Sequence, residues 1–225
     1  MFMTQYRTDA LENDQYYHIF SRSIAKYVIF NDAEDYSRFM EIADLYRHTK
    51  FYYQYSKFKR LSPIIQSEIL AQIHSDNDVY AETVAFCLMP THFHFLLKQR
   101  SDGGISKYIG TILNCYSRYF NIKHGRTGPL WSGRFKNVLV KNDEQLLHLT
   151  RYIHLNPCSA GLVEQPEQWE YSSFGKFIDE QNSHIKNSEI LAISPKQYKK
   201  FVMDRKDYQR ELSKIKSLII EEYSG

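Results

Sequence analysis

Acidic residues are missing from a long stretch of this sequence: no Asp or Glu occurs between residues 103 and 142. The whole chain has 26 acidic residues in 225 positions, so about five would be expected in a stretch of this length. The basic residues of the stretch are Lys107, Arg118, Lys123, Arg126, Arg134, Lys136 and Lys141. A long basic segment without acids indicates a polyanionic partner. The alternative is a solvated surface whose balancing acids lie elsewhere in the fold.

Cysteines and long apolar runs are also scarce. The three cysteines, Cys87, Cys115 and Cys158, form no CxxC pair, so the sequence indicates neither a disulfide framework nor a zinc ribbon. The N-terminus has no charged segment followed by an apolar one, and no apolar run is long enough to cross a membrane. We therefore expect a cytoplasmic protein with no membrane partner. A length of 225 residues suits one large domain or a smaller one with additions.

Hydrophobic periodicity predicts an alternation of strands and helices. The predicted strands cover residues 15–23, 79–90, 91–99 and 135–142. The predicted helices cover residues 35–48, 105–124 and 143–157, with a short helix after Pro63 and a charged helix from residue 195 to the C-terminus. Asn31 or Asp32, and Asn142 or Asp143, are placed to cap helices, and Pro157 is expected to end one. This order predicts an α+β fold, an antiparallel sheet with helices packed on it.

The segment CLMPTHFHFLLK, residues 87–98, carries two histidines on an apolar strand. Residues two apart on a strand point to the same face, so His92 and His94 are expected side by side, with Phe93 and Phe95 on the other face. Two imidazoles on one face supply half of a typical metal site and need a third ligand from elsewhere. The alternative is a pair of core-edge histidines that bond to backbone groups.

A second group of polar residues lies in LLHLTRYIHLNP, residues 146–157. On a helix, His148, Tyr152 and Asn156 are spaced four residues apart and form one polar line. The buried stripe of this helix is expected at Leu146, Leu149 and Ile153. Tyr152 and Asn156 together offer a hydroxyl nucleophile and a neutral oxygen ligand one turn apart. The alternative is a tyrosine that packs on the core and an asparagine that ends the helix.

Read together, these motifs resemble a family. The order CLMPTHFHFLL, YSRYFN, HGR, GPLWSGRFK and RYIHLNP, followed by a tryptophan and YSS, is similar to that of the REP-associated tyrosine transposases, IS200-like single-tyrosine nucleases of the HUH type. The resemblance covers roughly residues 16–177. It implies a ferredoxin-like antiparallel sheet within a catalytic domain of residues 1–180. The additions to it are an insertion around residues 50–79 and a C-terminal helical extension over residues 181–225.

The resemblance also implies roles for individual residues. Tyr152 is the implied nucleophile, in preference to Tyr116 or Tyr119 of the basic helix. His92, His94 and Asn156 are the implied ligands of a divalent cation, Mg²⁺ or Mn²⁺. The implied reaction is transesterification on single-stranded hairpin DNA through a 5′-phosphotyrosine, which allows strands to be cut and rejoined in transposition.

The basic segment supplies the predicted DNA contacts. The residues expected to bind phosphates are Arg118, Lys123, Arg126, Arg134 and Lys136. Trp131 and Tyr119 are expected to stack on extruded bases. For Trp131 an equally good alternative is that it anchors the glycine loop in the core. Two alternative functions stay open: a domesticated DNA-binding protein that does not cut, and a metal phosphodiesterase that uses water. The sequence leaves monomer and homodimer both open.

Overall fold

The computed structural model describes residues 10–76, 78–179 and 193–204. Four strands form one antiparallel sheet in the order β2-β3-β1-β4. Their bounds are Tyr16–Arg22 for β1, Ala81–Met89 for β2, His92–Gln99 for β3 and Lys136–Val140 for β4. The predicted α+β fold with helices on an antiparallel sheet is confirmed, and the predicted histidine strand is a central one.

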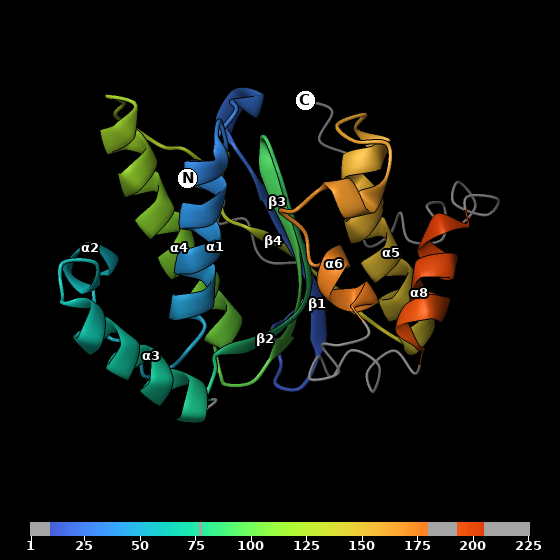
Figure 1. Cartoon of the computed structure of the whole chain (residues 1–225), viewed down its shortest axis with the longest axis horizontal. Helices are drawn as coiled ribbons and strands as arrows, with labels where there is room; N and C mark the ends of the chain where they lie inside the picture. The colour runs from blue at the N-terminus through green and yellow to red at the C-terminus, as the bar shows by residue number, and fades with distance from the viewer. Residues whose placement is uncertain (1–9, 77, 180–192, 205–225) are drawn as a thin grey trace, which may run out of the picture.

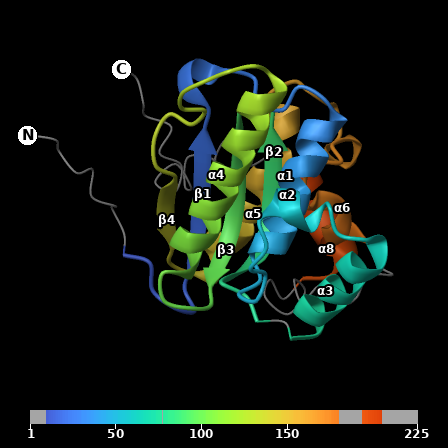
Figure 2. The ribbon, with the colours of Figure 1, turned by 90° about the vertical axis from the view of Figure 1, so that its left-hand side faces the viewer.

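Helices cover both faces of this sheet (Figure 1). One face carries α1 (Ala33–Tyr46) and α4 (Gly104–Lys123). The other carries α5 (Asp143–Ser159), α6 (Phe174–Ile178) and α8 (Pro195–Met203). Two further helices, α2 (Tyr55–Phe58) and α3 (Pro63–Asp76), lie outside α1, away from the sheet (Figure 2). Short 3-10 turns occur at η1 (Ile24–Lys26) and η2 (Pro166–Gln168).

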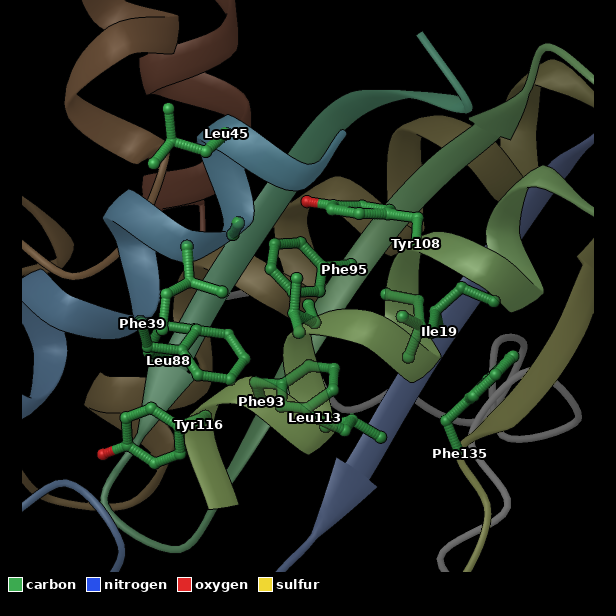
Figure 3. Packing of buried hydrophobic residues seen from close by; sticks show 14 of the residues in the cluster. Ile19, Phe39, Leu45, Leu88, Phe93, Phe95, Tyr108, Leu113, Tyr116 and Phe135 are labelled. Carbon is green, nitrogen blue, oxygen red and sulfur yellow. The ribbon is translucent and has the colours of Figure 1, made fainter. Parts of the chain in front are cut away.

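The alternation of β3 determines what each face contains. Phe93 and Phe95 point to α1 and α4, where their ring centroids lie 5.4 and 6.4 Å from that of Phe39. Figure 3 shows these rings packed with Tyr116 of α4. We call this the aromatic face, and we call the opposite face, under α5, the histidine face. The side chains of β1 and β4 alternate in the same way, so every second residue of each strand faces α5.

The predicted helix caps are present. The side chain of Asp32 accepts a hydrogen bond from the backbone N–H of Asp35 at 2.9 Å, and this bond starts α1. Asn142 does the same for Gln145 at 2.8 Å and starts α5. Each cap satisfies a backbone donor that the first helical turn leaves without a partner.

The prediction that Pro157 ends its helix is wrong, because α5 continues to Ser159. A proline removes one backbone donor from a helix, here the one that would bond the carbonyl of Ile153. The next bonds of the helix still form: Ala160 N–H donates to the Asn156 carbonyl at 2.9 Å. The helix therefore passes through the proline for a short final turn.

The additions to the core are described in part. The insertion predicted around residues 50–79 contains α2 and α3, and α3 is a helix of 14 residues, longer than the sequence indicates. The predicted C-terminal helix begins at Pro195, and residues 205–225 lie outside the described residues. Tyr198 and Val202 of α8 are buried in the same cluster as α5. The domain boundary at residue 180 stays a prediction.

Candidate functional site

His92 and His94 lie side by side on the histidine face, near the turn that joins β2 to β3. Their ring centroids are 5.1 Å apart and the rings are nearly perpendicular, at 88°. The side chain of His94 is buried, with 4% of its surface exposed, and His92 is half-buried. His94 is therefore shielded from solvent, and His92 is partly exposed.

Each of these imidazoles is held through its Nδ1 atom. His94 Nδ1 shares a hydrogen bond with His18 Nε2 of β1 at 2.9 Å. His92 Nδ1 shares one with Thr91 Oγ1 at 3.0 Å. The Nε2 atom of His94 is buried and has no hydrogen-bond partner. Partners of this kind fix the ring orientation of metal-binding histidines, and they leave the Nε2 atoms for a cation.

Both imidazoles are neutral at physiological pH. Burial lowers the pKa of His92 to about 4, and the nearby charge of Arg22 adds to the effect. Burial also holds the pKa of His94 well below its usual range, with smaller contributions from His92, His18 and Arg22. A neutral imidazole presents a lone pair to a cation, whereas a protonated one does not.

Tyr152 of α5 packs on His94 of β3 and on His18 of β1. Its ring centroid is 5.6 Å from that of His94 and 6.2 Å from that of His18, in edge-to-face contacts at 84° and 79°. Only 5% of Tyr152 is exposed. The predicted buried stripe of the helix, Leu146, Leu149 and Ile153, is indeed buried and carries α5 on the sheet. The structure therefore brings the predicted nucleophile next to His94, one of the predicted ligands.

Asn156 follows Tyr152 by one turn of α5 and is half-buried. Its amide nitrogen donates to the Tyr152 carbonyl at 3.0 Å, so the amide oxygen is the atom left for a cation. His148, the third member of the predicted polar line, belongs to another contact. Its Nδ1 atom accepts a hydrogen bond from Arg151 Nη2 at 3.2 Å, and its ring lies 5.5 Å from the ring of Phe201 on α8.

The donor atoms of this site suit a divalent cation. The buried Nε2 of His94 has no partner, and burial without a hydrogen bond costs free energy that a bound cation would remove. His92 adds a second imidazole, and Asn156 offers an amide oxygen from the facing helix. Two imidazole nitrogens and one amide oxygen form a ligand set that Mn²⁺ accepts readily and that Mg²⁺, which prefers oxygen ligands, binds more weakly.

Two basic residues of the sheet lie beside the histidines. Arg22 of β1 is paired in register with His92 of β3. On β1, Phe20 is paired with His94 on one side and with Lys136 of β4 on the other. Directly opposed residues of antiparallel strands point to the same face, so both cations share the histidine face. Arg134 is exposed two residues before β4 begins.

The basic residues of α4 lie on the other side of the sheet. Arg118 is exposed on α4, in the layer that covers the aromatic face. Arg126 follows α4, where its guanidinium lies 4.9 Å from the ring centroid of Tyr27 and donates to Asn121 at 3.2 Å. The acid-free segment of the sequence is therefore split between the two layers and forms no single strip next to the histidines.

The prediction that Lys123 contacts phosphate is not supported, because its charge is already balanced. Lys123 Nζ lies 2.8 Å from Asp32 and 2.8 Å from Asp35, and 3.4 Å from Glu34. These acids begin α1, far away in the sequence. The alternative interpretation of the basic segment, that acids elsewhere balance it, holds at this residue.

The burial of Trp131 favours the alternative that it anchors the glycine loop over the prediction that it stacks on bases. Trp131 is 9% exposed, and its indole N–H donates to the Leu113 carbonyl at 3.2 Å. Its ring packs 5.6 Å from Phe93 on the aromatic face. Tyr119 is also engaged, since its hydroxyl donates to Asp35 at 2.9 Å. The buried hydroxyl of Tyr116 donates to the Ile29 carbonyl at 2.5 Å.

Sequence reasoning missed His18 and Arg22. The signal was present: in QYYHIFSRS, His18, Phe20 and Arg22 are spaced two apart on a predicted strand and so share one face. Choosing that face as the site requires the register of β1 against β3, which pairs Arg22 with His92. A pairing between residues 70 positions apart is not visible in the local pattern.

Comparison with known proteins agrees with this geometry. The family described as "Transposase IS200 like" matches residues 12–156. A REP-associated tyrosine transposase assigned in Haemophilus influenzae is 31% identical over 107 residues, which is 43% of this chain and 61% of that protein. The REP-associated tyrosine transposase of Escherichia coli strain K12 is 24% identical over 98 residues, 43% of this chain and 56% of that protein. The matches thus span less than two thirds of either relative.

A solved structure shares the fold. It is described as the REP-associated tyrosine transposase bound to a REP hairpin and superposes with a TM-score of 0.51, 17% sequence identity and coverage of 81% of this chain and 90% of that one. At this identity the likeness concerns the fold alone. The matched residues 12–156 contain β1 to β4 and α5 as far as Asn156, and on this evidence the chain belongs to the IS200-like transposase family.

Proposed function

We propose that this transposase cleaves and rejoins single-stranded hairpin DNA, with Tyr152 as the nucleophile. The observation that carries the proposal is the packing of the Tyr152 ring against His94, whose Nε2 atom is buried without a partner. A phenol beside a buried imidazole, with an amide one helical turn away, combines a nucleophile with candidate ligands.

The reaction is a transesterification at one phosphate. The Tyr152 oxygen forms a bond to phosphorus while the bond from phosphorus to the 3′-oxygen breaks, which leaves a 5′-phosphotyrosine and a free 3′-hydroxyl. The phenol proton passes to a base, and the 3′-oxygen takes up a proton as it leaves. A 3′-hydroxyl of another strand can then reverse the reaction and displace Tyr152. The phosphodiester is conserved throughout, as strand transfer requires.

The rigid setting of Tyr152 contributes to the rate. The tyrosine is buried on a helix that packs on the sheet, so few conformations are lost when it meets the phosphate. A divalent cation held by His92, His94 and Asn156 would neutralise charge on the scissile phosphate. Mg²⁺ or Mn²⁺ is the proposed ion, and the hydrogen bonds from His18 and Thr91 orient the two imidazoles for it.

The histidine face also carries the proposed phosphate contacts. Arg22 and Lys136 flank the histidines in the register of the sheet, and Arg134 lies next to this group. Cations at these positions would hold the DNA backbone on either side of the scissile phosphate. Arg118 and Arg126, in the opposite layer, are proposed to contact a more distant part of a hairpin. The REP hairpin bound by the solved relative supports this class of substrate.

Two alternative functions make different predictions. A domesticated DNA-binding protein would bind hairpins without cutting them. A water-using phosphodiesterase would cut but form no covalent adduct, and Tyr152 would then be structural. If Tyr152 is structural, its edge-to-face packing on His18 and His94 serves to hold α5 on the sheet.

The test is incubation of the protein with an end-labelled hairpin oligonucleotide and Mn²⁺, followed by a denaturing gel. We expect a 5′-labelled hairpin to give a shortened free fragment, and a 3′-labelled hairpin to give a labelled band that moves with the protein. Tyr152→Phe should remove both products. Tyr119→Phe is the matched control, because Tyr119 is the rival tyrosine on α4, and it should leave both. Cutting without a covalent band would favour hydrolysis, and binding without cutting would favour the domesticated protein.

A further inference from the structure

A second cluster of metal-ligating side chains lies in the opposite layer from Tyr152. Asp44 belongs to the last turn of α1, His48 follows that helix, and His74 belongs to the last turn of α3. One ligand atom from each residue lies within 4.8 Å of the other two. Among the described residues, this is the one place where three groups of the His, Cys, Asp and Glu types gather in this way. It joins the insertion around residues 50–79 to α1.

His48 is the unusual member of the cluster. Its side chain is buried, with 2% of the residue exposed, and neither ring nitrogen has a hydrogen-bond partner. Burying an imidazole with both nitrogens unsatisfied costs free energy. A bound cation would satisfy one of these nitrogens and remove part of that cost.

The other two ligands stand at the solvent side of His48. Asp44 Oδ2 lies 3.6 Å from His74 Nε2, while Asp44 Oδ1 accepts from Arg47 Nε at 3.1 Å. One carboxylate oxygen is thus held by an arginine and the other faces the histidines. The His48 and His74 rings are 5.1 Å apart between centroids. Asp44 and His74 are exposed, so an ion can reach the cluster and keep water as further ligands.

We propose that Asp44, His48 and His74 bind a divalent transition-metal ion of the zinc type, and that this ion fastens α3 to the end of α1. Two imidazoles and one carboxylate form a ligand set that Zn²⁺ accepts with water in the fourth position. Mg²⁺ prefers oxygen ligands in octahedral geometry, so it competes poorly here. The lone ion pair of Asp44 with His74 is the simpler arrangement, but it leaves both nitrogens of His48 unsatisfied.

Backbone hydrogen bonds near the cluster hold the two ends of the insertion together. His48 forms an isolated antiparallel bridge with Val79. Thr49 N–H donates to the Asp78 carbonyl at 2.9 Å, and Tyr80 N–H donates to the Arg47 carbonyl at 2.8 Å. The chain that enters the insertion therefore lies beside the chain that leaves it. An ion at His74 would add the end of α3 to this junction, separately from the chemistry under α5.

The test must separate this site from the histidines of β3. The starting protein is therefore the His92→Ala, His94→Ala double variant of the full chain, equilibrated with Zn²⁺, freed of excess ion and analysed for bound metal. We expect one Zn²⁺ per chain and a thermal midpoint that rises with Zn²⁺ and not with Mg²⁺. Because loss of a hydrogen-bond partner of a ligand already weakens metal binding about 10–100-fold, loss of a ligand itself should weaken it by more than about 100-fold.

Adding His74→Ala to this protein should remove the bound Zn²⁺ and the rise of the midpoint. His74 is exposed, so its loss should not unfold the chain without metal. His124→Ala, at another exposed histidine, is the matched control and should keep the ion. The double variant without bound Zn²⁺, or a His74→Ala protein that retains it, would overturn the proposal. Asp44→Asn should weaken the site in the same direction as His74→Ala, and unchanged Zn²⁺ affinity in that variant would also contradict it.

Discussion

The histidine face and the aromatic face of the sheet are built by the same strands but differ in how their polar groups are used. On the aromatic face, rings of β3 pack on Phe39 and Trp131, and the buried Trp131 N–H and Tyr116 hydroxyl bond to backbone carbonyls. On the histidine face, a buried imidazole nitrogen has no partner and a tyrosine lies over it. Satisfied polar groups stabilise a fold, and an unsatisfied buried group indicates a binding site.

This comparison predicts opposite consequences for neighbouring residues of one strand. His94→Ala should reduce cleavage at least about 10³-fold, which corresponds to about 4 kcal/mol of activation free energy. Hairpin binding should change little, because phosphate contacts carry most of the affinity. His92→Ala should behave in the same way. The measurement is a cleavage assay beside a gel shift. Loss of binding together with a large fall in melting temperature would mean that the histidines are structural.

Phe93→Ala, between the two histidines, should lower the stability of the fold and leave cleavage largely unchanged. Phe93 is fully buried against Phe39 and Trp131, and removal of such a ring costs about 3 kcal/mol or more of unfolding free energy. Urea denaturation measures this loss. The cleavage rate per folded molecule should stay within a few-fold of the wild type. A stable Phe93→Ala protein that cannot cut would erase the distinction between the two faces.

The ion pair of Asp35, in the layer over the aromatic face, should make the unfolding free energy depend on pH. Burial raises the pKa of Asp35, but hydrogen bonds from Lys123, Asn31 and Tyr119 outweigh it, so the pKa in the folded protein lies below the ordinary 3.8. The unfolded chain then binds more protons as the pH falls below about 4–5, and stability is lost in that window. Above it, the contribution is fully present. Removing a charged hydrogen-bond partner costs about 2 kcal/mol.

Asp35→Asn is the corresponding test. At pH 7 its unfolding free energy should be lower than that of the wild type, and the difference should shrink as the pH falls towards 3. Thermal melts at several pH values measure this. A difference that stays constant with pH would show that the Asp35 carboxylate and Lys123 do not act as an ion pair. Cleavage at pH 7 should not depend on this group.

The smallest expected effect concerns the DNA contacts. Lys136→Gln should lower the slope of log affinity against log salt by about one, as expected for one lost phosphate contact, and Arg134→Gln should do the same. Arg118→Gln, in the opposite layer, should change the slope less. Filter binding at several salt concentrations measures these slopes. Equal effects of all three variants would contradict the smaller contribution to affinity that is expected from Arg118, at a more distant part of the hairpin.

The sequence predicted whatever depends on local periodicity. The period of two in β3 placed the histidines and phenylalanines on opposite faces, and the period of α5 placed Tyr152 and Asn156 one turn apart. Both hold because a strand or helix imposes its period on its side chains wherever it packs. The caps at Asp32 and Asn142 are local for the same reason.

Features that depend on distant residues could not be predicted. Lys123 pairs with Asp32 and Asp35, about 90 positions earlier. Because these acids are distant in the sequence, the local pattern gave no sign that they balance the charge of Lys123. Trp131 is buried because the loop after α4 folds back under α1. Pro157 is tolerated because the helix ends two residues later. His18 joins the site only through the pairing of β1 with β3. The predicted Tyr152 packs on His94, His94 lies beside His92, and the Asn156 amide bonds to the Tyr152 carbonyl.

The central claim is that Tyr152, and no other tyrosine, forms the covalent bond to DNA. The most direct measurement is nuclease and protease digestion of the wild-type adduct, followed by mass spectrometry of the tyrosine peptides. The account predicts a nucleotide on the peptide that contains RYIHLNP. A nucleotide on the peptide that contains YSRYF, or complete cleavage without any modified peptide, would contradict it.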